Sequence, residues 1–189
     1  AVHSLPSERL GTLAGHRDSV WAVAALPGDP AHVLTGGEDH TVRVWDVRTS
    51  TTVATLPGAS ASVYALAVSA DASTLAVGLG DGDISLWSLS TATVTPTARG
   101  VISAHVGGTF GLAFNPTQPW MLMSGGADGA VRLWDTRGGQ AVLLDERTRH
   151  SGWVWAVGFS PDGNLAGSVG QGRTDNTRWW RINSISRTL

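Results

Sequence analysis

Two sets of polar side chains combine a hydroxyl, an imidazole and a carboxylate at the same spacing. The members are His16, Thr35 and Asp39 in the first set, and His105, Ser124 and Asp128 in the second. In both sets the hydroxyl lies 19 residues after the His and four residues before the Asp. These are the groups of a hydrolytic triad, in which a carboxylate orients a His that activates a hydroxyl nucleophile. The composition of the sets therefore raises the hypothesis of a hydrolase.

A structural network is the competing interpretation of the same residues. In each set a Trp follows the Asp by six residues, Trp45 in the first and Trp134 in the second. A buried indole N–H needs an acceptor, and a hydroxyl can accept from Trp while it donates to His. An enzyme needs one such site, whereas a repeated structural unit needs one in every copy. The chain also has no nucleophile-elbow motif, so we expect a structural role and no enzymatic activity.

The Trp residues mark a repeat that covers nearly the whole chain. Four of them are spaced 42, 47 and 46 residues apart: Trp45, Trp87, Trp134 and Trp180. A second landmark precedes each of them by 28 to 30 residues: His16, Ala59, His105 and His150. A fixed period of 40–50 residues is the signature of a repeat architecture.

Each repeat is predicted to form four strands. In the first, residues 20–26 are apolar enough for a buried strand, 32–36 follow the turn "PGDP", and 41–47 alternate as a half-buried strand does. Residues 38–40 supply a turn, and 51–56 form a more polar fourth strand. Four-stranded antiparallel units of this length are typical of β-propeller blades.

These phrases resemble the WD40-repeat family, most clearly "GH…VWAV…TGGEDHTVRVWD" and "AH…LAF…SGGADGAVRLWD". The resemblance implies an all-β fold of four consecutive four-stranded antiparallel blades in a partial, open ring. The expected blades cover residues 14–57, 58–101, 102–146 and 147–189, and residues 7–13 form the outer strand of a preceding or last blade.

The resemblance also implies a structural tetrad of His, Ser or Thr, Asp and Trp in each blade. The second repeat keeps Asp81 and Trp87, but Ala59 replaces the His and Val77 replaces the hydroxyl. We therefore expect that blade to rely on apolar packing. The fourth repeat offers a separate, less regular set: His150, Ser168, Asp175 and Trp180.

A step of three between apolar positions predicts a β-bulge at the start of each innermost strand, which would re-aim the side chains there. The aromatic residues next to this step are Trp21, Tyr64, Phe110 and Trp155, with Trp153 two residues before the last. By resemblance they lie on a rim that binds partners, together with Glu38, Gly80 and Ala127. Interface hot spots favour Trp and Tyr; the alternative is that the rings fill the channel or pack between blades.

Two segments read Trp-Asp-x-Arg, ending at Arg48 and Arg137. They resemble the box with which WD40 substrate receptors dock onto cullin–RING ubiquitin ligases. The alternative is that each Arg is simply a solvated charge.

Composition narrows the function classes. The 189 residues carry 13 Arg, no Lys and 15 acidic residues, so no basic face suggests nucleic acid. The absence of Cys excludes disulfides and thiolate metal sites, and the tetrad His residues lie in separate repeats rather than in one cluster. We expect no metal, no cofactor, no membrane insertion and an intracellular location, cytoplasmic or nuclear.

Four blades of this kind would leave two bare sheet edges, which template pairing with another chain. Segments 8–13 and 182–189 read as outer strands, and the chain starts with Ala rather than Met. We favour a segment of a longer propeller, or one completed by another chain, over closure by a second copy into eight blades. The expected function is a protein–protein interaction scaffold in a larger complex.

Overall fold

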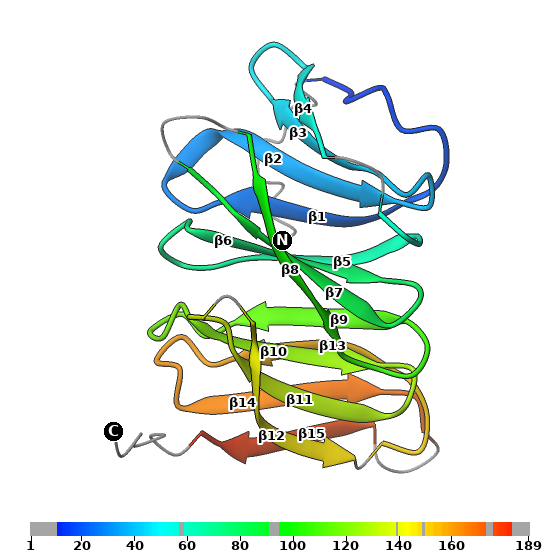
Figure 1. Cartoon of the computed structure of the whole chain (residues 1–189), viewed down its shortest axis with the longest axis vertical. Coiled ribbons are helices and arrows are strands. Elements are labelled where there is room, and N and C mark those ends of the chain that lie inside the picture. The colour runs from blue at the N-terminus through cyan, green and yellow to red at the C-terminus, as the bar shows by residue number, and fades with distance from the viewer. Residues whose placement is uncertain are drawn as a thin grey trace, which may run out of the picture.

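The computed structural model of the chain describes residues 11–56, 59–90, 95–138, 140–148, 150–172 and 176–182 (Figure 1). These residues form fifteen β-strands and no helix. No helix long or apolar enough to cross a membrane therefore occurs among them.

The strands form four antiparallel sheets, each built from strands that are consecutive in the sequence. We call the sheets blades 1 to 4. Blade 1 contains β1 (Val20–Leu26), β2 (Asp29–Gly37), β3 (Val42–Asp46) and β4 (Thr51–Thr55). Blade 2 contains β5 (Val63–Val68), β6 (Thr74–Leu79), β7 (Asp83–Ser88) and β8 (Thr97–Ser103). Blade 3 contains β9 (Thr109–Phe114), β10 (Met121–Gly126), β11 (Ala130–Asp135) and β12 (Val142–Thr148). Blade 4 contains β13 (Val154–Phe159), β14 (Leu165–Gly170) and β15 (Thr177–Arg181).

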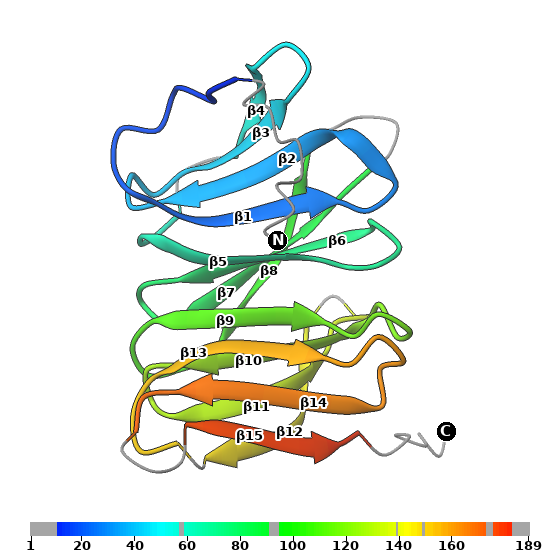
Figure 2. The ribbon, with the colours of Figure 1, turned by 180° about the vertical axis from the view of Figure 1, so that it is seen from behind.

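The blades stack face to face in chain order, with blade 1 at one end and blade 4 at the other (Figures 1 and 2). The innermost strands β1, β5, β9 and β13 lie side by side along one side of the stack. The first and last blades do not meet, so the predicted all-β, open arrangement of propeller blades is confirmed.

The ends of the chain differ in part from the expectation. Residues 11–13 carry no strand, and residues 8–10 of the predicted outer strand lie outside the described residues. The predicted fourth strand of blade 4 also lies outside them except for Ile182. Blade 4 therefore has three strands in the described part of the chain.

The turn between the first two strands is shorter than predicted. The segment "PGDP" was expected to form the whole turn, but β2 begins at Asp29, so only Pro27 and Gly28 separate it from β1. Gly28 adopts φ 76°, a left-handed conformation that glycine reaches without steric cost. The Asp29 carboxylate then accepts a hydrogen bond from the Ala31 amide, which stabilises the start of β2.

The hydrophobic core lies between the blades. Leu34 and Val44 of blade 1 pack against Val63 and Leu75 of blade 2, and all four are buried. Similar apolar clusters lie between blades 2 and 3 and between blades 3 and 4. Each blade is therefore stabilised mainly by its neighbours, because burial of apolar surface is the main favourable term in folding.

A register shift occurs at the start of every innermost strand. It falls between Val20 and Ala22 in β1, and at the equivalent places in β5, β9 and β13. Such a shift is a β-bulge, and it turns the side chain of the unpaired residue away from the sheet's normal alternation. In each blade this unpaired residue is aromatic: Trp21, Tyr64, Phe110 and Trp155.

Candidate functional site

The polar set in blade 3 forms one connected network. His105 Nδ1 lies 2.8 Å from Asp128, and His105 Nε2 lies 2.8 Å from the Ser124 hydroxyl. Trp134 donates its indole N–H to the same hydroxyl at 2.9 Å. Ser124 is completely buried and Trp134 nearly so. The network thus supplies the acceptor that a buried indole N–H requires.

The set in blade 1 has the same connections. His16 Nδ1 lies 3.0 Å from Asp39, and His16 Nε2 lies 2.7 Å from the Thr35 hydroxyl. Trp45 donates to Thr35 at 2.7 Å and is almost fully buried. Asp39 also accepts hydrogen bonds from the amides of Arg17 and Thr41, which attaches the segment before β1 to the turn after β2.

Burial and hydrogen bonding set the charges of the two networks. Burial lowers the pKa of His105, and its contact with Asp128 only partly offsets this effect. Burial raises the pKa of Asp128, but hydrogen bonds from Arg132 and His105 outweigh it and lower the value to about 2. Burial likewise opposes ionisation of Asp39, yet hydrogen bonds from Arg17, Thr41 and His16 hold its pKa well below the usual range. The two shifts act in the same direction, since both favour a neutral imidazole next to an ionised carboxylate in blade 3.

The arrangement does not suit nucleophilic catalysis. A triad nucleophile must be reached by substrate while it is hydrogen-bonded to the His. Ser124 has no exposed surface and lies between His105 and Trp134, so a substrate could reach it only if the blades separated. In blades 1 and 3 the hydrogen bonds instead connect the central strands to the segment that precedes the innermost strand.

Blade 2 lacks the two central members of the network. Val77 is buried in the apolar cluster between blades 1 and 2, and Trp87 and Ala59 pack against the same cluster. The carboxylate of Asp81 accepts a hydrogen bond from Ser60 at 2.6 Å. Apolar packing therefore occupies the place that the polar network has in blades 1 and 3.

One Arg connects blade 2 to blade 3. Arg99 of β8 donates hydrogen bonds to the Thr74 hydroxyl and to the carbonyl oxygens of Thr136 and Gly138. The two carbonyl groups lie 37 and 39 residues further along the chain, so nothing in the local sequence pattern indicated this contact.

Blade 4 keeps part of the network. His150 Nε2 lies 2.6 Å from the Ser168 hydroxyl, and Ser168 is buried. The predicted Asp175 lies outside the described residues. Within those residues, the buried indole N–H of Trp180 has no hydrogen-bond partner. The Trp of this blade is thus not joined to the hydroxyl as it is in blades 1 and 3.

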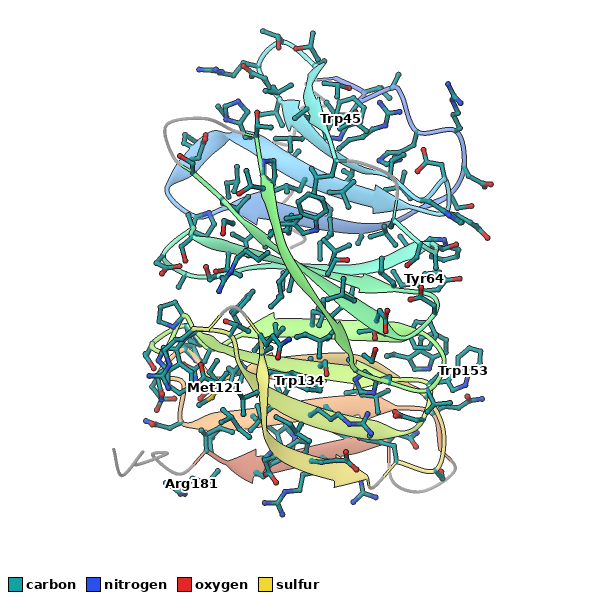
Figure 3. The ribbon with its side chains drawn as sticks, viewed as in Figure 1. Trp45, Tyr64, Met121, Trp134, Trp153 and Arg181 are labelled. Carbon is teal, nitrogen blue, oxygen red and sulfur yellow. The ribbon has the colours of Figure 1, made fainter. Side chains whose placement is uncertain are left out.

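The aromatic side chains at the four bulges, together with Trp153 just before β13, form a continuous array. We call it the aromatic arc: Trp21, Tyr64, Phe110, Trp153 and Trp155. Ring centroids of neighbouring members are 5.0 to 6.2 Å apart from blade 1 to blade 4. The three Trp side chains are 44–58% exposed. Tyr64 and Trp153 lie along the same edge of the stack (Figure 3).

The arc borders a hollow between the innermost strands. This cavity of about 300 Å³ is lined by four members of the arc and by the small residues Ala22, Ala65, Gly111 and Ala156. The contacts between the rings agree with the alternative that these side chains fill the channel. The exposure of the three Trp side chains nevertheless leaves the outer face of the arc accessible to a partner.

Main-chain hydrogen bonds hold the neighbouring rim positions in place. The amide of Glu38 donates to Ser19, that of Gly80 to Ser62, and that of Ala127 to Gly108. Each acceptor lies just before an innermost strand, so these positions flank the arc. In blade 4 the amide of Gln171 donates to Trp153 in the same way. Gln171 was missed in the sequence because that turn has unusual spacing.

The two Trp-Asp-x-Arg segments place each Arg against its own Asp. Arg48 makes two side-chain hydrogen bonds to Asp46, and Arg137 does the same with Asp135. Arg137 also lies over the Trp120 ring, 3.9 Å from its centroid. The side chains of Arg48 and Arg137 remain 68% and 48% exposed.

No group of three or more His, Cys, Asp or Glu residues in the described part of the chain is arranged to hold a metal ion.

The chain matches the family described as "WD domain, G-beta repeat" four times, over residues 7–46, 50–88, 97–135 and 142–177. Among curated proteins it is 30% identical over 167 residues to the "Ribosome biogenesis protein WDR12 homolog" of Nematostella vectensis, which covers 88% of this chain and 38% of the relative. It is 28% identical over 173 residues to the "Eukaryotic translation initiation factor 3 subunit I" of Drosophila willistoni, covering 86% of this chain and 52% of the relative. The chain thus spans about half or less of these relatives.

Solved structures share the fold. The "computationally designed Ika4 protein" superposes with a TM-score of 0.73 at 26% identity, covering 94% of this chain and 99% of that one. "Structure of U3-55K" superposes with a TM-score of 0.76 at 22% identity, covering 90% of this chain and 51% of that one.

Proposed function

The chain belongs to the WD domain, G-beta repeat family, and on that premise we propose that it is a non-enzymatic scaffold that binds other protein chains through the aromatic arc. The relatives support an assembly role, since one is named for ribosome biogenesis and another is a subunit of a translation initiation factor. Such a role would place the protein inside the cell, in the cytoplasm or nucleus.

The exposed aromatic arc is the observation that carries this proposal. Trp21 and Trp155 are 58% and 48% exposed although each contacts another ring of the arc. Rigid aromatic side chains supply large contact areas at low entropic cost, and Trp is enriched among the residues that dominate binding energy. The hydroxyls of the polar sets are buried, which supports a function without catalysis.

Two Trp substitutions test the proposal. Tagged wild-type chain and the variant Trp21→Ala/Trp155→Ala would be used to capture proteins from an extract of the source organism, and the captured proteins identified by mass spectrometry. We expect the specific partners to be lost from the double variant and retained by Val101→Ala, which alters an exposed apolar side chain of outer strand β8. A folded double variant that keeps every partner would contradict a role for the arc.

Docking onto a ubiquitin-ligase adaptor is a second candidate, because both Arg side chains of the Trp-Asp-x-Arg segments are partly exposed. The alternative is a purely local role, in which each Arg only forms an ion pair with the Asp of its own segment, Asp46 or Asp135. If the ligase hypothesis is right, Arg48→Ala/Arg137→Ala abolishes adaptor binding; unchanged binding would exclude it.

A further inference from the structure

A second cavity lies between blades 1 and 2, at the end of β1 that is remote from the aromatic arc. It has a volume of about 270 Å³ and mostly apolar walls. Leu34 and Val44, two buried residues of the core between these blades, form part of its lining together with the half-buried Leu26. Tyr64 and Trp153 of the arc lie on the opposite side of the stack from the turn between β1 and β2 (Figures 1 and 3). The cavity therefore belongs to an internal interface and is separate from the arc.

Blade 1 differs from the other blades at the residue that follows the last regular pair between its first two strands. These pairs are Ala25 with Val33, Val68 with Leu75, Phe114 with Leu122, and Phe159 with Ala166. They are equivalent, because the second member of each pair lies opposite the repeat Trp on the next strand. The residue after the first member is polar in three blades and apolar in blade 1: Ser69, Asn115, Ser160 and Leu26.

The polar residue stabilises the turn in the other blades. Ser69 accepts a hydrogen bond from the Thr74 amide, and the equivalent Ser of blade 4 does the same with the start of its own second strand. Leu26 cannot accept such a bond, and its side chain lines the cavity instead. Pro27 and Pro30 of the same turn also line the cavity, and both are exposed. Apolar side chains at an exposed turn, next to an open cavity, indicate a surface that contacts something other than water.

The mouth of this cavity carries negative charge. Asp29 lines the cavity, its side chain is 37% exposed, and a hydrogen bond from the His32 ring lowers the pKa of its carboxyl group. Asp71 precedes a lining residue on the blade 2 side, and Asp46 interacts with the same His32. Among the described residues at this mouth, the cations are Arg48, which already pairs with Asp46, and His32 when it is protonated. The carboxylates therefore outnumber the cations, and the mouth favours a ligand with a positive charge.

The size of the cavity suits one large apolar side chain. Pockets for drug-sized ligands have roughly 300–1,000 Å³, which is more than this cavity offers. We propose that the cavity binds a segment of a partner protein in which a large apolar side chain, such as Leu, is adjacent to an Arg or Lys. The apolar side chain enters between blades 1 and 2, and the cation pairs with Asp29. This site is separate from the aromatic arc, so the protein can bind one partner at each.

Short peptides test both parts of this recognition. The probes are N-acetyl-Leu-Arg-amide and N-acetyl-Leu-Glu-amide, each titrated into the isotope-labelled chain and followed by NMR. We expect the first peptide to shift the amide signals of Leu26, Gly28 and Ala72. It should bind about two- to fivefold more tightly than the second, which is the usual contribution of an exposed ion pair. Replacing Leu by Ala in the first peptide should weaken binding at least about fivefold, because less apolar surface is buried.

Two variants with matched controls assign the binding to this cavity. Leu26→Ser gives blade 1 the residue type of blades 2 and 4 and should abolish the selective shifts. Asp29→Asn removes the charge and should make the Arg and Glu peptides bind equally. Leu165→Ser and Asp162→Asn make the same changes at an exposed Leu and a turn carboxylate of blade 4, and should leave binding unchanged. Circular dichroism establishes that each variant is folded; if Leu26→Ser does not fold, Asp29→Asn and the peptide pair still decide the question.

Three results would overturn the proposal: no shifts around the cavity at any peptide concentration, equal affinity of the wild-type chain for the Arg and Glu peptides, or shifts confined to the aromatic arc. The double variant Trp21→Ala/Trp155→Ala should bind the Arg peptide as the wild-type chain does, because the arc lies at the other end of the innermost strands. A failure at this cavity can thus be told apart from a failure of the proposed function.

Discussion

Blades 2 and 3 lie side by side but fill the centre of the sheet with different chemistry. In blade 3, Ser124 joins His105 to Trp134, whereas blade 2 has Val77 in an apolar cluster. Both blades nevertheless have four strands and the same order of pairing. The polar network is therefore not required to form a blade. The network positions the buried Trp and the segment before the innermost strand, whereas apolar packing is sufficient to form the four-stranded sheet.

The largest difference in stability between blades 2 and 3 is expected when the Trp of each blade is replaced by Ala. Trp134→Ala deletes a side chain that is 6% exposed and leaves Ser124 without its donor. We expect it to lower the free energy of unfolding by about 3–5 kcal/mol. Trp87→Ala removes a side chain that is only partly buried and should cost less. Urea denaturation of both variants measures the two losses, and equal losses would remove the distinction between the blades.

A smaller effect is expected from rebuilding the network in blade 2. Val77→Ser alone puts a hydroxyl into an apolar cluster, which should cost about 1–3 kcal/mol. Adding Ala59→His supplies the imidazole that is missing from a repeat that keeps Asp81 and Trp87. A double-mutant cycle from denaturation curves should then give a favourable coupling of at least about 0.5 kcal/mol. Strictly additive losses would show that the backbone of blade 2 no longer accommodates the network.

The smallest effect is expected from pH. Burial lowers the pKa of His105 below its ordinary value of 6.5, so the unfolded chain takes up a proton on this residue at a higher pH than the folded chain. The free energy of unfolding should therefore fall as the pH drops below 6.5. Blade 2 has no equivalent group at Ala59. Melting curves from pH 7.5 to 5 should show a shallower dependence for His105→Gln; identical slopes would mean that His105 does not contribute.

Local pattern predicted most of the fold and the members of the polar sets. Alternation located β3, and the fixed distance from His105 to Trp134 identified residues that the fold brings within hydrogen-bonding range. These features depend on residues within one blade, where the chain returns after a short turn. The length of β2 was less predictable, because Pro30 appeared to belong to the turn.

Contacts between blades could not be read from the sequence. The hydrogen bonds from Arg99 to Thr136 and Gly138 depend on how two sheets stack. Val169 of blade 4 takes the register position that glycines occupy in the other three blades, and this equivalence follows only from its pairing with Ala156. No hydrophobic pattern distinguishes that valine from any other half-buried one.

The stacking of blades in chain order has a consequence for how the molecule comes apart. The principal contacts between sheets join strands of consecutive blades, such as β1 with β5 and β9 with β13. The free energy of unfolding is therefore approximately a sum of the stability of each blade and of the interfaces between neighbouring blades. Within the described residues, blades 2 and 3 each pack against a neighbouring blade on both sides, so loss of either one should expose the facing surfaces of two other blades.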